Sequence, residues 1–134
     1  MAVRDRMSWL MLSLAGLFLL IGALLIAAPR PGAQLFGIPA VHEDGLVYVR
    51  AVGFRDLALA LYIALLTLWA SRRALAILLA ATVLIPVLDF VMVLVVRGAS
   101  SPWHLALHAG SATVFAGLAL TCARSRQARA QAGR

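Results

Sequence analysis

The chain has 134 residues, of which 63% are hydrophobic and 13% are charged, and its mean hydropathy is +0.97. A water-soluble domain of this size needs a large polar surface, which this composition cannot supply. The net charge of +7 comes from arginines in short polar stretches between apolar runs. This distribution is typical of a membrane protein and argues against a nucleic acid as partner.

Four apolar runs are each long enough to cross a bilayer as a helix. They cover residues 8–28, 46–70, 74–96 and 103–122. The first run resembles a signal peptide, but its length of about twenty residues exceeds the ~7–15 of a signal sequence and predicts an uncleaved span. Short connections predict antiparallel neighbours. We therefore expect an all-α, four-helix transmembrane up-down bundle over residues 1–123, followed by a basic, disordered cytoplasmic tail, residues 124–134.

The arginines predict the orientation of the chain. With the N-terminus in the cytoplasm, eight arginines lie inside and about three outside, which follows the positive-inside rule. Trp9 and Trp69 then fall near the inner interface, and Tyr48 and Trp103 near the outer one. The prediction is a multi-pass protein of the cell inner membrane with both termini cytoplasmic.

Several ionisable residues interrupt the apolar runs. They are Arg55, Asp56, Asp89, His108 and, close to an end, His104. Each costs at least ~2.5–3.5 kcal/mol inside a bilayer and needs a partner or a task. At ~1.5 Å per residue, Arg55, Asp89 and His108 lie ~13, ~10 and ~8 Å from the outer ends of their runs. We therefore expect one polar level in the outer half of the membrane.

The favoured ion pair joins Arg55 to Asp89, because guanidinium binds carboxylate bidentately. Arg55 and Asp56 are adjacent and point ~100° apart, so we do not expect them to face each other. Tyr62 lies seven residues beyond Arg55 on the same helix face. Pro86 removes a backbone hydrogen bond and predicts a kink before Asp89.

Other interpretations of these residues stay open. Buried ion pairs sometimes only fix helix register. His104 and His108 have the i, i+4 spacing of metal ligands, with Asp89 as a third ligand, but the glutamate of a His-Glu-x-x-His motif is absent. We favour hydrogen bonding or proton exchange between histidine and carboxylate, and predict no metal and no cofactor.

Small residues predict close helix packing within the chain. Gly16 and Gly22 lie on the first run, and Ala109, Thr113 and Gly117 recur every four positions on the fourth. A homo-oligomer is not indicated, although it stays open.

The string from Gly53 to Ala60, Gly-Phe-Arg-Asp-Leu-Ala-Leu-Ala, resembles the Gly-x-Arg-Asp signature of a family of small four-helix membrane proteins from bacteria and fungi. The family is catalogued as a domain of unknown function. Residues 35–39 (Leu-Phe-Gly-Ile-Pro), residues 86–89 (Pro-Val-Leu-Asp) and a histidine early in the fourth run fit the same pattern. The resemblance covers residues 29–120 and implies the architecture and the polar positions, but no activity.

The leading functional hypothesis is a polar pocket that opens outward and binds membrane lipid or a small lipophilic molecule. Its expected lining is Arg55, Asp56, Tyr62, Asp89, His104 and His108. In an enzyme, Asp89 or His108 would be the acid/base and Arg55 would stabilise negative charge, which suits an isomerase or cyclase. The alternatives are a small proton-coupled transporter, with Asp56 or Asp89 carrying the proton, and a structural or accessory membrane subunit.

Overall fold

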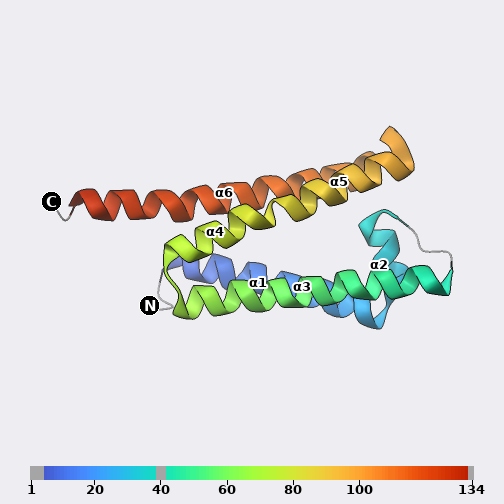
Figure 1. The fold of residues 1–134 in the computed structure, drawn as a ribbon, viewed down its shortest axis with the longest axis horizontal. Coiled ribbons are helices and arrows are strands. Elements are labelled where there is room, and N and C mark those ends of the chain that lie inside the picture. Colours follow the sequence, from blue (N-terminus) through green and yellow to red (C-terminus); the bar gives the residue numbers. More distant parts are fainter. Residues whose placement is uncertain (1–4, 39–41, 133–134) are drawn as a thin grey trace. The chain divides into compact units, whose positions relative to one another are not determined.

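The computed structural model describes residues 5–38 and 42–132, with side chains described as far as residue 124. In chain order its helices are α1 (Arg6–Ala27), α2 (Pro29–Phe36), α3 (Glu43–Trp69), α4 (Arg72–Thr82), α5 (Leu84–Arg97), the 3-10 helix η1 (Gly98–Ser100) and α6 (Pro102–Ala132) (Figure 1). This described part contains no strand.

Four stretches are long and apolar enough to cross a membrane: Arg6–Ala27, Glu43–Trp69, Arg72–Ser100 and Pro102–Arg124. Their bounds differ from the predicted ones by at most four residues. The predicted all-α fold with four apolar spans is confirmed, and the chain is a multi-pass membrane protein. The helix α6 continues beyond Arg124, where the predicted tail begins, to Ala132.

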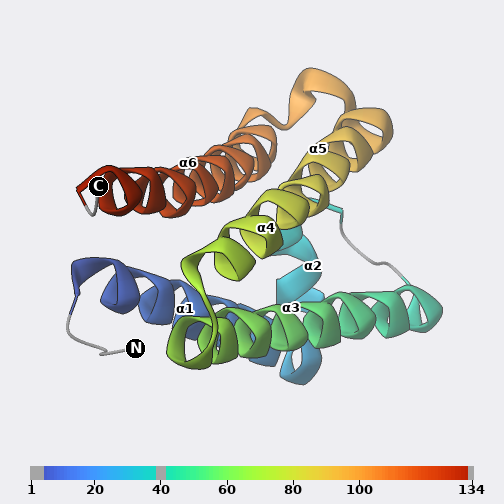
Figure 2. The same ribbon diagram turned by 60° about the vertical axis from the view of Figure 1, so that its left-hand side comes forward.

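The chain divides into two compact units, Met1–Leu68 and Trp69–Arg134, and each contains one helical hairpin. In the first unit, α1 and α3 run side by side in opposite directions (Figure 1, Figure 2). The N-terminus of α1 is capped by Asp5, whose carboxylate accepts a hydrogen bond of 2.7 Å from the backbone N–H of Ser8. Such a cap satisfies one of the free N–H groups at the start of a helix.

The segment between these two helices forms α2, which runs across the direction of α1 (Figure 2). Its Gly32 packs so closely on the end of α1 that an added Cβ would lie 2.7 Å from Cδ2 of Leu25. It ends at Gly37, whose φ of 104° is a left-handed conformation that favours glycine. The connection between α1 and α3 therefore contains a helix of its own, folded back onto α1.

Two glycines bring the backbones of α1 and α3 into contact. A Cβ on Gly22 would lie 2.8 Å from the carbonyl oxygen of Gly53, and a Cβ on Gly53 would lie 2.9 Å from that of Gly22. Steps of seven residues from this contact reach further small, buried residues on both helices. The resulting small-residue seam consists of Ser8, Ala15 and Gly22 on α1 and Gly53, Ala60 and Thr67 on α3. A seven-residue repeat keeps one face of each helix toward the other along the whole pair.

The second unit pairs α4 and α5 with α6, which returns alongside both of them (Figure 1). The N-terminus of α4 is capped by Ser71, whose hydroxyl accepts a 3.2 Å hydrogen bond from the backbone N–H of Ala74. The third span is interrupted at Val83, between α4 and α5. Pro86 has no N–H to donate to the carbonyl of Thr82, so the interruption lies within the turn that lacks this bond. The interruption lies where the kink before Asp89 is expected, but Val83 keeps helical dihedral angles (φ −54°, ψ −31°), so the kink itself stays a prediction.

The second hairpin also packs on a seven-residue repeat. Its buried positions form a heptad seam of Leu75, Thr82 and Asp89 on the third span and His108, Phe115 and Cys122 on α6. Larger side chains fill this seam than fill the small-residue seam of the first unit. Asp89 and His108 are among its members, so these two ionisable groups lie in the helix contact and not on the lipid-facing surface.

The faces turned away from these contacts are apolar, as lipid contact requires. Trp9, Trp69, Tyr48 and Trp103, the aromatic residues expected at the two membrane interfaces, are all exposed. The small residues of α6 are exposed too, and a Cβ on Gly117 would meet no described atom within 4 Å apart from its own helix backbone. Within the described part of the second unit this face of α6 meets no other helix, and its packing against another helix of the chain stays a prediction.

Candidate functional site

The Gly-x-Arg-Asp string lies in the middle of α3 and contains an ion pair between neighbouring residues. Nε of Arg55 donates a hydrogen bond of 3.1 Å to Oδ1 of Asp56. The side chain of Asp56 is 5% exposed and that of Arg55 is 33% exposed. Our expectation that these adjacent residues cannot face each other is wrong, because the long arginine side chain bends toward the next residue along the helix.

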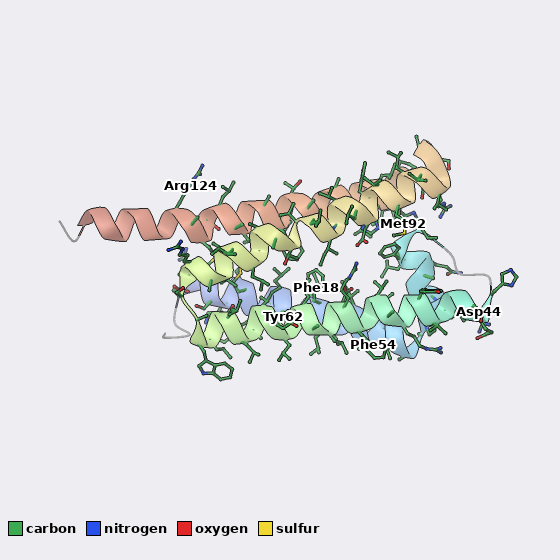
Figure 3. All side chains as sticks on the ribbon, in the orientation of Figure 1. Phe18, Asp44, Phe54, Tyr62, Met92 and Arg124 are labelled. Atoms are coloured by element: carbon green, nitrogen blue, oxygen red, sulfur yellow. The ribbon has the colours of Figure 1, made fainter. Side chains whose placement is uncertain are left out.

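The burial of Asp56 follows from its position beside the small-residue seam. It lies three residues after Gly53 and four before Ala60, the spacing that places a side chain on the same helix face. Tyr62 and Phe54, also on α3, are both largely exposed (Figure 3). Tyr62 therefore lies outside the buried part of its unit, and its contact with a ligand stays a prediction.

The second unit holds Asp89 on α5 and His108 on α6, with 8% and 6% of their surfaces exposed. Asp89 lies eight residues before Arg97 at the end of α5, and His108 lies six residues after Pro102 at the start of α6. At ~1.5 Å per residue these positions are ~12 and ~9 Å from the turn that joins the helices. Both are members of the heptad seam, so the hairpin brings a carboxyl group and an imidazole to nearly the same level.

A second histidine contact lies nearer the turn. The hydroxyl of Ser101 and Nδ1 of His104 are 2.5 Å apart, with Ser101 buried and His104 half-buried. We did not predict this contact from the sequence. Ser101 directly precedes α6, and a serine followed by a proline is typical of a helix start. A residue at this position can contact the side chain three residues later, and this spacing is the sequence signal that could have identified the contact with His104.

The chemistry available in the second unit is proton exchange. A carboxyl group and an imidazole inside an apolar span are favourable only when other polar groups satisfy them, and together they can accept and donate one proton. Among the residues that the structure describes, no group of three or more His, Cys, Asp or Glu could hold a metal ion. Arg55 and Asp89 belong to different units, so their predicted pairing stays a prediction.

Comparison with known proteins gives one match. Residues 15–122 match the model of a family described as a domain of unknown function (DUF4267). The match includes both seams for most of their length, the Arg55–Asp56 pair, Asp89 and His108. No curated protein and no solved structure matches the chain.

Proposed function

The chain belongs to the DUF4267 family, and we propose that it binds a small lipophilic molecule beside a buried acid–base pair formed by Asp89 and His108. The observation that carries this proposal is the burial of both residues in the contact between α5 and α6. Ionisable groups in a membrane span are kept at a cost in stability, and a function for them is the first hypothesis.

The proposed chemistry is an isomerisation or cyclisation within the membrane. One member of the pair takes a proton from the bound molecule while the other returns a proton at a second atom, so that no water is consumed. Neither step needs a nucleophile. A lipophilic molecule suits the setting, because it reaches the helix pair directly from the surrounding lipid.

The interruption of the third span supports a second candidate, a small proton-coupled transporter. Broken helices near a carboxylate are a feature of transporter binding sites, and Val83 lies six residues before Asp89. In this alternative Asp89 binds and releases the proton that is carried. Vesicles containing the protein would then acidify in response to a gradient of the transported molecule, whereas an isomerase would leave the internal pH unchanged.

The proposed location is the inner membrane, with both termini in the cytoplasm. Eight arginines lie in the segments on the proposed cytoplasmic side and about three on the other side. Membrane proteins keep arginine in short cytoplasmic segments.

The test is to identify what the purified protein carries. The protein is extracted in a mild detergent, and bound lipophilic molecules are measured by mass spectrometry relative to total phospholipid. We expect Asp89→Asn and His108→Gln each to lower the bound molecule at least tenfold, since each removes a polar partner. Asp44→Asn and His42→Gln change the same residue types at exposed positions and are the matched controls. Equal retention in all five proteins would contradict the proposal.

A further inference from the structure

Two buried hydroxyl groups in the first unit lack the partners that buried polar groups normally have. Among the side chains that the structure describes, Oγ of Ser8 and Oγ1 of Thr67 are the buried oxygen or nitrogen atoms with no hydrogen-bond partner. The two residues are 1% and 2% exposed. A polar atom that leaves water without a new partner is unfavourable, and most such atoms in proteins bind another group or an ordered water.

Other hydroxyl residues in the spans show the usual alternative. Thr82 donates to the carbonyl of Leu78 at 2.8 Å, and Ser111 donates to that of Leu107 at 2.9 Å. Such bonds within a helix satisfy the hydroxyl without outside help. Thr82 is nearly as buried as Thr67, so burial alone does not explain why Thr67 makes no such bond.

The small-residue seam places the two hydroxyl residues at the same level. Ser8 lies fourteen residues before Gly22, and Thr67 lies fourteen residues after Gly53. The two glycines are in contact, and α1 and α3 run in opposite directions, so two full heptads lead from that contact to Ser8 on one helix and to Thr67 on the other. Ala15 and Ala60, one heptad from the contact, are buried on the way.

We propose that Ser8 and Thr67 together bind one ordered water molecule at the end of the small-residue seam farthest from α2. A water needs two to four polar partners and a polar, narrow site. The two hydroxyls supply two of these partners, and the small residues of the seam let the two helices approach closely enough for one water to reach both. The site joins the first turn of α1 to the last turn of α3 and is independent of the proposed acid–base pair.

The first test measures stability by reversible unfolding in mixed micelles. Ser8→Ala and Thr67→Val each remove one partner of the water, and we expect each to lower the folding equilibrium constant three- to tenfold. The double variant has neither hydroxyl, so its folding equilibrium constant should fall by less than the product of the two factors measured for the single variants. Thr82→Val is the matched control. When it is combined with Ser8→Ala, the folding equilibrium constant should fall by the full product of the two single-variant factors. Single variants that are each more stable than the wild type would overturn the proposal.

A second test needs no variant. In wild-type protein in bilayers, solid-state NMR magnetisation transfer from water should reach the Cβ protons of Ser8 and Thr67 and not those of Thr82. Coupling between the two mutations without this transfer would show a direct bond between the hydroxyls and would also overturn the proposal.

Discussion

The Arg55–Asp56 ion pair is asymmetric, because Asp56 is buried while a third of the Arg55 side chain is exposed. A buried carboxylate that loses its cation has no water nearby, whereas an arginine side chain can extend its charge toward headgroups or water. We therefore expect Arg55→Gln to lower the free energy of unfolding by ~2–3 kcal/mol and Asp56→Asn by ~1–2 kcal/mol. Reversible unfolding in mixed micelles measures both.

The Arg30–Glu43 pair supplies the control for this prediction, because both of its side chains are mostly exposed. An exposed pair contributes little, so Arg30→Gln should change the free energy of unfolding by less than ~0.5 kcal/mol. Similar losses for Arg30→Gln and Arg55→Gln would show that burial of Asp56 does not set the energy of its pair.

The sequence identifies which polar residues lie in the spans, but not which atoms they contact. The ~100° between neighbouring positions describes where side chains leave the helix, and the flexible arginine then bends back to Asp56. Hydroxyl residues show the same limit. Thr82 bonds to its own helix while Thr67 does not, and the sequence does not predict which of the two hydroxyls makes such a bond.

At the scale of the element, lipid removes the signal that usually shows which face of a helix is buried. Apolar residues face both lipid and protein, so Met11 is fully buried while Leu20 on the same helix is largely exposed. The size of residues is more informative. Gly22 packs as predicted because it lies in step with Ala15 and Ser8, whereas Gly16 is one position out of step and meets no described atom of another helix.

Replacing a glycine by alanine should destabilise the protein at the contact between Gly22 and Gly53 and stabilise it at glycines outside that contact. A Cβ on Gly53 would lie 2.8 Å from Cγ1 of Ile26 and 2.9 Å from the carbonyl oxygen of Gly22. We expect Gly53→Ala to destabilise the protein by ~1–3 kcal/mol, since the backbones must move apart. Gly16→Ala and Gly117→Ala have room for the methyl group and should stabilise by ~0.4–1 kcal/mol. Thermal unfolding in detergent measures all three, and destabilisation by all of them would contradict the assigned contact.

At the scale of the whole molecule, length and hydropathy are enough to predict four spans, because a bilayer of about 30 Å requires about twenty apolar residues per helix. The antiparallel hairpins follow because consecutive spans cross the bilayer in opposite directions. The sequence did not indicate α2, since eight residues with two prolines are too few for a periodic pattern. It also did not separate the hairpins into two units, because that division depends on contacts between side chains.

The topology of the whole chain is tested by reporters fused at its ends and at its turns. Four spans place the two termini on one side of the membrane, and the arginines predict that this side is the cytoplasm. A fluorescent protein fused after Arg134 or Ser71 should therefore be fluorescent and an alkaline phosphatase there inactive. Fusions at Gly45 and Ser100 should show the reverse, because these residues lie at the ends of the second and third spans that are expected to face outward. Exchanging Arg72 and Arg73 for glutamine removes two of the eight inner arginines and should increase the share of inverted molecules. The same result at Arg134 and Gly45 would contradict four spans, and the opposite result at every site would contradict the predicted orientation alone.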